Sequence, residues 1–198
     1  MIEVEIKLKV SSPEVVEQQL RQLGFAYHAA YLQEDSYYDN RDGLIRSDGQ
    51  ALRLRTITAC GDGKPSSHTC ITFKGKKLDT VSMTRQELET EVGDRFVLDR
   101  ILQALGYQVI PPSVVKHRKE YVRSGFHLPD DNRTQITMNA CLDQVDGLGD
   151  FLELEMMTDE DERGMALDCI EEMLHKLGYS ICDTTTSSYL SMLQGVED

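Results

Sequence analysis

Charged side chains recur at every second position along several segments of this 198-residue chain. Near the N-terminus Glu3, Glu5 and Lys7 alternate with apolar residues, and further along Arg53 and Arg55 do the same. Side chains at positions i and i+2 share one face of a β-strand, so each group would line one face. Comparable alternating groups are Lys74 with Lys76, Arg85 with Glu87 and Glu89, Lys116 with Arg118, and Glu153 with Glu155.

Two arrangements could accommodate so many charged faces. They could be solvated outer faces with cross-strand ion pairs. Alternatively, a closed barrel could carry the charges inside, with helices or a second copy of the chain in a homodimer covering its apolar outside. An interior lined by both signs is costly without a ligand. Lys and Arg suit phosphate oxygens, and Glu oxygens suit Mg²⁺ or Mn²⁺. The second arrangement therefore predicts a site for a polyanion that carries a divalent cation.

The elements that would hold these side chains are mostly strands. Period-two alternation predicts strands at 2–10, 51–58, 69–74, 85–92, 114–122, 135–142 and 151–157. Helical spacing and end signals predict helices at 13–23, 94–105 and about 158–177. Asp146, Gly147 and Gly149 favour a hairpin between the last two strands. Because most strands are neighbours in sequence, we expect one α+β domain over residues 1–198 with a mainly antiparallel sheet.

Composition narrows the function classes. The chain has 21 Lys and Arg against 34 Asp and Glu, a net charge of −13, which argues against nucleic-acid binding. A local basic pocket is still compatible with this total, because concave sites focus charge. The chain has no apolar run long enough for a spanning helix, and residues 1–10 are too charged for a signal peptide. We therefore expect no membrane partner and a cytoplasmic location.

The order of these motifs resembles the CYTH family, the triphosphate tunnel metalloenzymes. The run Glu3-Val4-Glu5-Ile6-Lys7 is similar to the ExExK signature of that family. Segments similar to the family follow in order along the chain: 35–39, 51–55, 72–75, 85–89, 115–118, 142–155 and 188–190. Residues 74–79 and the Gly-Leu-Gly-Asp-Phe hairpin at 147–151 most resemble the class IV adenylyl cyclase branch.

This resemblance implies a closed eight-stranded antiparallel β-barrel that forms a tunnel, with helices packed outside. By matching positions, Glu3, Glu5 and Glu153 would hold Mg²⁺ or Mn²⁺, with Glu155 and Asp143 as further candidates. The phosphates would be bound by six cations: Lys7, Arg53, Arg55, Lys74, Lys116 and Arg118. Among these, Lys7, Arg55, Lys74 and Arg118 would also serve catalysis. Arg85 would join the substrate-binding set or a supporting shell of ion pairs with Glu87 and Glu89.

The resemblance implies an enzyme acting on a small-molecule triphosphate. A class IV-type adenylyl cyclase would convert ATP to cyclic AMP and pyrophosphate. The alternative is a hydrolase of inorganic tripolyphosphate or of another organic triphosphate, in which water is the nucleophile. The sequence does not place that nucleophile, so both reactions stay open. A hypothesis of another class is a non-catalytic module that binds nucleotide or polyphosphate.

Overall fold

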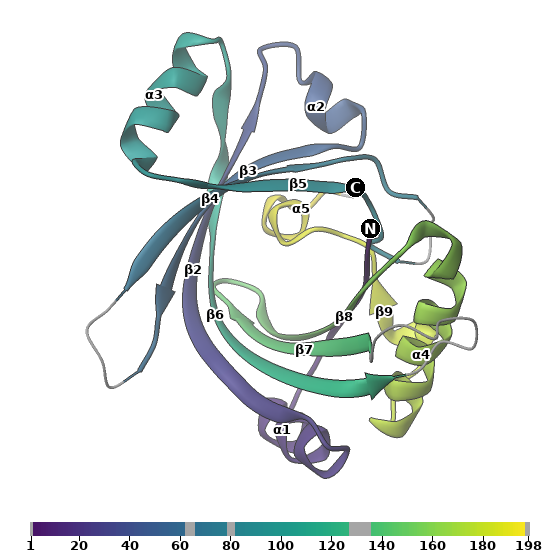
Figure 1. Cartoon of the computed structure of the whole chain (residues 1–198). Coiled ribbons are helices and arrows are strands. Elements are labelled where there is room, and N and C mark those ends of the chain that lie inside the picture. The colour runs from purple at the N-terminus through teal and green to yellow at the C-terminus, as the bar shows by residue number, and fades with distance from the viewer. Residues whose placement is uncertain (1, 62–65, 79–81, 127–135, 197–198) are drawn as a thin grey trace.

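The structure is a computed structural model that describes residues 2–61, 66–78, 82–126 and 136–196. One antiparallel sheet dominates it and curls around a central space (Figure 1). Its strands are β1 (Ile2–Lys9), β2 (Ala26–Asp39), β3 (Ala51–Ala59), β4 (Ser67–Lys74), β5 (Glu87–Val92), β6 (Gln108–Phe126), β7 (Ile136–Val145), β8 (Gly149–Thr158) and the two-residue β9 (Thr184–Thr185). Their order across the sheet is β5-β4-β3-β2-β6-β7-β8-β1-β9. The prediction of an α+β fold with eight antiparallel strands is confirmed.

The two edges of the curled sheet approach each other without forming a continuous ladder. Glu3 of β1 makes an isolated antiparallel bridge with Arg85, which lies just before β5. The N–H of Met83 also donates to the carbonyl oxygen of Glu5 at 2.9 Å. The structure therefore establishes a strongly curled sheet, whereas the expectation from sequence was a fully closed barrel.

Helices occupy the connections between strands. They are α1 (Pro13–Gln22), α2 (Leu44–Ser47), α3 (Arg95–Ala104), α4 (Arg163–Lys176) and α5 (Tyr189–Gln194), with 3₁₀ turns at Glu160–Glu162 and Ile181–Asp183. In Figure 1, α1, α3 and α4 lie outside the curl, and α5 lies within its outline. The three predicted helices correspond to α1, α3 and α4. The carboxylate of Asp94 caps α3 by accepting hydrogen bonds from the N–H groups of Phe96 and Val97.

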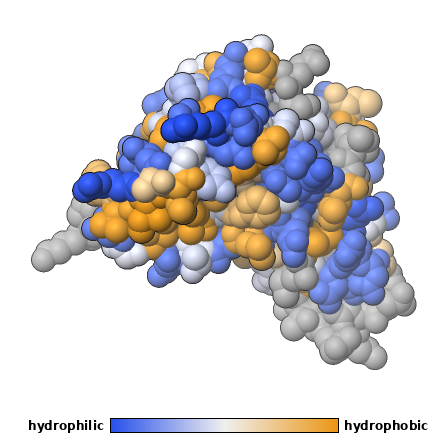
Figure 2. Space-filling model, turned by 90° about the horizontal axis from the view of Figure 1, so that it is seen from above, coloured by the Kyte–Doolittle hydropathy of each residue, from blue (hydrophilic) through white to orange (hydrophobic). Residues whose placement is uncertain are grey.

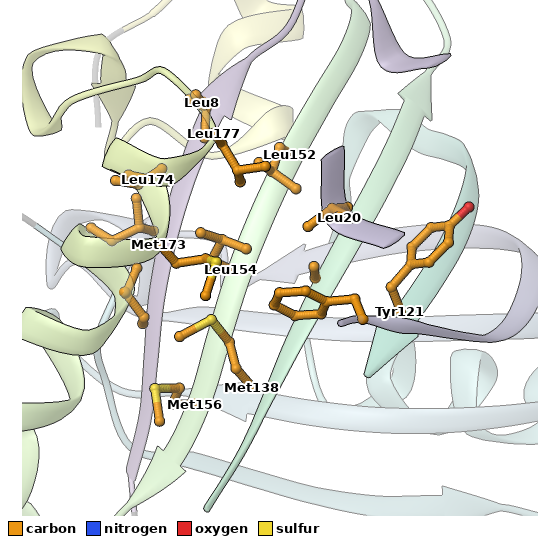
Figure 3. Packing of buried hydrophobic residues seen from close by; sticks show 14 of the residues in the cluster. Leu8, Leu20, Tyr121, Met138, Leu152, Leu154, Met156, Met173, Leu174 and Leu177 are labelled. Atoms are coloured by element: carbon orange, nitrogen blue, oxygen red, sulfur yellow. The ribbon is translucent and has the colours of Figure 1, made fainter. Parts of the chain in front are cut away.

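The main hydrophobic core lies between the outer face of the sheet and the helices. The apolar side chains of β1, including Val4 and Leu8, pack with Leu154 of β8 and with Leu174 of α4 (Figure 3). Leu20 of α1 closes the same cluster. Because these strands alternate, the charged side chains between the apolar ones point to the concave side. Helices thus cover the apolar outer face of the sheet, which agrees with the arrangement in which the charged side chains face inward.

The helix α3 buries only part of its apolar surface. Leu102 is buried against the sheet, whereas Phe96, Val97, Ile101 and Leu105 are 80%, 53%, 48% and 70% exposed. A hydrophobic patch accordingly stands out at the left of Figure 2, where α3 lies in Figure 1. The helical spacing of Val97, Leu98, Ile101, Leu102 and Leu105 indicates one apolar face, and the structure shows that most of this face is exposed.

Within the described ranges, no helix combines the length and the apolar composition that a membrane span requires.

Candidate active site

The concave side of the sheet encloses a cavity of about 780 Å³. Eleven of the twelve site residues predicted from sequence line it: Glu3, Glu5, Lys7, Arg53, Arg55, Lys74, Arg85, Lys116, Arg118, Glu153 and Glu155. The twelfth, Asp143, is buried behind the wall and is 1% exposed. Ten lining side chains are Lys or Arg and seven are Asp or Glu. The cavity is therefore locally positive in a chain whose net charge is −13.

Three carboxylates of the cavity lie close to one another. The β1–β8 register places Glu5 directly opposite Glu155, and two positions along β1 lies Glu3. Like charges directly opposite each other destabilise a sheet. Burial raises the pKa of Glu155 to about 7, with contributions from Glu153 and Glu5 that Arg118 partly offsets. Burial, followed by a neighbouring carboxylate, also raises the pKa of Glu3 and of Glu5. Arg118 lies 3.5 Å from Glu155, whereas among the described residues Glu3 and Glu5 form no ion pair and interact with Lys7 and Lys74 only at longer range.

The donor chemistry of this group fits a hard divalent cation. Among the described residues, no group of three or more His, Cys, Asp or Glu side chains is placed to hold a metal ion by itself. Mg²⁺ does not require such a cage, because it commonly binds one or two carboxylates together with water and substrate phosphates. Glu5 and Glu155, with Glu3 beside them, supply such a partial set.

Asp143 and Glu153 have a different environment. Arg118 donates to both carboxylate oxygens of Asp143 at 2.7 Å, and Lys116 donates to Oδ2 at 2.7 Å. Arg118 also pairs with Glu153. Although burial opposes ionisation, Arg118 and Lys116 outweigh it and lower the pKa of Asp143, and the same cations lower the pKa of Glu153. Both carboxylates are thus engaged by fixed cations, and their role as metal ligands stays a prediction.

Two further cations on the opposite wall are also paired. Arg55 donates to both oxygens of Asp35, at 2.6 and 2.7 Å, in a bidentate contact set by the β2–β3 register. Lys74 pairs with Glu87 across β4 and β5. Asp35 is 2% exposed, and the sequence did not single it out as a site residue. Asp35 lies in the segment 35–39 that resembles the family, and this position was the feature of the sequence that could have identified it as a site residue.

One cation of the cavity forms only long ion pairs, and two others form none within the described residues. Arg53 lies 4.0 Å from Asp35 and 3.7 Å from Glu89, and its buried Nε atom has no hydrogen-bond partner. Lys7 and Arg85 are 2% and 6% exposed, and within the described part of the chain neither side chain forms a hydrogen bond or ion pair. Among the described residues, the cavity thus holds two cations without an ion pair, Lys7 and Arg85, together with two carboxylates without one, Glu3 and Glu5.

A curled antiparallel sheet around such a cavity defines a protein that can enclose a polyanion with its metal ion. A family model described as CYTH domain matches residues 1–189. The chain therefore belongs to the CYTH domain family. Membership implies an enzyme that depends on a divalent metal and takes a small-molecule triphosphate as substrate.

Individual relatives agree with this assignment. A protein of Methanocaldococcus jannaschii named "putative adenylate cyclase" is 34% identical over 97% of this chain and 98% of its own length. Adenylate cyclase CyaB of Aeromonas hydrophila is 25% identical over 82% of this chain and 72% of its own. The solved structure of the PH1819 protein from Pyrococcus horikoshii OT3 has a TM-score of 0.79 and 28% identity, and the match covers 98% of each chain.

Proposed function

We propose that this protein is a class IV-type adenylyl cyclase, which converts ATP to cyclic AMP and pyrophosphate with Mg²⁺ or Mn²⁺. The observation that carries the proposal is that one cavity contains both carboxylates and cations that form no close ion pair. Glu5 faces Glu155, which Arg118 contacts only at 3.5 Å, and within the described residues Glu5, Lys7 and Arg85 form no ion pair. A metal–triphosphate complex supplies both missing partners at once.

In this proposal the residues of the cavity have distinct roles. Glu3, Glu5 and Glu155 would hold the metal, with Glu153 beside them. A bound divalent cation would neutralise phosphate charge and assist the nucleophile or the leaving group. Lys7, Arg53 and Arg85 would bind phosphate oxygens directly.

The paired cations would contribute differently. Arg118 and Lys116 are fixed in place by Asp143, and Arg55 is fixed by Asp35. They would present a rigid positive surface that needs no rearrangement as charge develops on the reacting phosphate. The substrate and Glu87 would compete for the ammonium group of Lys74, so Lys74 would keep part of its ion pair with Glu87 when substrate is bound.

The features that favour a nucleotide are the apolar side chains on the same wall. Ile45, Leu52 and Ile110 line the cavity alongside the charged residues. Inorganic tripolyphosphate has no apolar surface to contact them, whereas a nucleoside does. Hydrolysis of tripolyphosphate is the alternative reaction, because the cavity's charge pattern suits any triphosphate.

Closure of the barrel belongs to the same proposal. Arg85 and Met83 contact β1 where a closing strand would pair with it. A closed tunnel would keep bulk water from the triphosphate, which favours attack by the ribose hydroxyl over hydrolysis.

A product assay tests the function. The protein is incubated with ATP or with tripolyphosphate, each with Mg²⁺ and with Mn²⁺, and the products are separated by chromatography. Cyclic AMP and pyrophosphate from ATP are expected. Glu5→Gln, which removes a charge without changing size, should abolish turnover, and Glu14→Gln on the exposed side of α1 is the matched control. Release of phosphate alone supports the hydrolase, and tight binding without turnover supports a binding module.

A further inference from the structure

The ammonium group of Lys7 is buried in the cavity wall without an anionic partner. Lys7 is 2% exposed and lines the cavity, yet its side chain makes no hydrogen bond or ion pair within the described ranges. The neighbouring lysines differ, because Lys116 pairs with Asp143 and Lys74 pairs with Glu87. A buried cation without an ion pair is costly, and although Glu5 and Glu153 interact with Lys7 at longer range, a direct contact also stabilises its ammonium group.

That contact is the ring of Tyr189, the first residue of α5. The Nζ atom of Lys7 lies 4.5 Å from the ring centroid, and Nζ of Lys116 lies 5.1 Å from it. Both distances are within the range of cation–π attraction. The hydroxyl group of Tyr189 donates to Asp143 at 3.1 Å, and Phe151 packs edge-on against the ring with centroids 5.0 Å apart. Tyr189 is 6% exposed, so its ring is held firmly in place.

Two further contacts fix the helix that carries this ring. Ser188 caps α5 by accepting a hydrogen bond from the N–H of Ser191. Arg46, which belongs to α2, donates to the side-chain oxygen of Gln194 at 2.5 Å. Ser188 thus stabilises the start of α5, and Arg46 connects its end to α2.

A ring face stabilises an ammonium group in a way that an ion pair cannot. It attracts the cation without neutralising it and leaves N–H donors available to a phosphate. The alternative partner is close, because Glu153 lies directly opposite Lys7 in the β1–β8 register. The flexible stem of a lysine would allow that ion pair to form. Such a pair would compete with the substrate for the same ammonium group.

We propose that Tyr189 is a positioning residue that holds Lys7 through its ring face and keeps the ammonium group available to the phosphates of the substrate. This inference rests on the proposed triphosphate site and adds the residue that prepares it. Prior placement of a binding group lowers the ordering cost of binding. Loss of the ring should therefore weaken substrate binding before it affects the chemical step.

The test compares Tyr189→Phe, which keeps the ring, with Tyr189→Leu, which removes it. Calorimetry measures the dissociation constant of Mg²⁺–tripolyphosphate, and steady-state kinetics separate KM from kcat. A desolvated cation–π contact predicts affinity about 2- to 30-fold weaker for Tyr189→Leu, mainly in KM, and a smaller loss for Tyr189→Phe. Tyr27→Leu, at a half-exposed tyrosine outside the cavity, is the matched control. Where Tyr189→Leu does not fold, Tyr189→Met fills a similar volume without a ring.

A double-mutant cycle identifies the partner of the ring. In the Lys7→Met background, the difference in tripolyphosphate affinity between Tyr189→Phe and Tyr189→Leu should shrink clearly, because the nearer of the two ammonium groups that contact the ring is absent and only Lys116 remains. An undiminished difference there, or equal affinities of the two variants in the wild-type background, overturns the role of Tyr189. If the wild-type protein binds no triphosphate, the proposed function itself fails, and that result precedes any comparison of variants.

Discussion

The carboxylates of Glu5 on β1 and Glu155 on β8 lie opposite each other, and from them we predict that the stability of the folded protein depends on pH. In the free protein, burial raises the pKa of Glu155 from its ordinary value of 4.5 to about 7. A raised carboxyl pKa means that the folded state binds the proton more tightly than the unfolded state. The resulting stability is fully present below pH 4.5 and is lost as the pH rises through about 7. At about 1.36 kcal/mol for each unit of pKa, this shift corresponds to about 3 kcal/mol.

A divalent cation should reverse this loss. Metal ions bind the deprotonated carboxylates, so binding competes with protons below pH 7 and releases them. For a single competing proton with a pKa of about 7, apparent affinity should fall about fivefold between pH 7 and pH 6 and about tenfold for each further unit. Thermal melts with EDTA and with Mg²⁺ or Mn²⁺ measure the effect at pH 5.5 and at pH 8. We expect a clearly larger rise in Tm on adding metal at pH 8.

Other titrating groups act in a separate pH range. Hydrogen bonds from Lys119 and Arg21 lower the pKa of Glu17 to about 2, so its contribution to stability is lost only as the pH falls below about 4.5. The variant Glu155→Gln is the specific control, because it removes the titrating group and keeps the shape. It should lose most of the stability change between pH 4.5 and 7 and bind metal more weakly. Equal metal-induced shifts at both pH values, or an unchanged pH profile in Glu155→Gln, would refute the reasoning.

The other predictions concern separate parts of the fold. Arg55→Lys breaks the bidentate contact with Asp35, so chemical denaturation should report a loss of about 1.5–3 kcal/mol, and no loss would mean that the pair is not formed. Asp94→Ala removes the cap of α3 and should lower the unfolding free energy by about 1 kcal/mol with turnover unchanged. A homodimer, which the sequence leaves open as one way to cover apolar surface, would use the exposed apolar face of α3. Light scattering should then show a dimer that becomes monomeric in Ile101→Asp, and a wild-type monomer would contradict it.

The strands that alternate strictly were predictable from sequence, and those that do not were missed. Residues 2–9 alternate because one side packs against helices and the other faces the cavity, so the pattern reflects both environments. In β2 the residues from Ala26 to Tyr31 carry small and aromatic side chains on both faces, which gives no period-two signal. Only its end, at 35–39, was expected, through the family resemblance. The short α5 and β9 contain too few residues for any periodic pattern.

The wall of the cavity was predicted better than its internal contacts. Alternation indicates which side chains of a strand face inward. It therefore predicted that Arg53, Arg55 and Glu155 lie on the inner face, and all three line the cavity. It does not specify which cation meets which carboxylate, because that depends on strands far apart in sequence. Asp35 meets Arg55 through the β2–β3 register, and Tyr189 reaches Lys7 from the end of the chain. The roles of these residues in binding and catalysis stay predictions.

The division of charges in the cavity connects these contacts with the proposed chemistry. If every cation were paired with a protein carboxylate, substrate binding would have to break several buried ion pairs, each at substantial cost. If none were paired, the free protein would carry strong internal repulsion. The structure lies between these limits, because Asp143 and Asp35 fix Arg118 and Arg55, while Arg53 forms only long ion pairs. Lys7 and Arg85 form no ion pair within the described residues. Under the proposed function, a metal-bound triphosphate would therefore enter without breaking the ion pairs of Asp143 and Asp35. It would neutralise the charged side chains that form no ion pair within the protein.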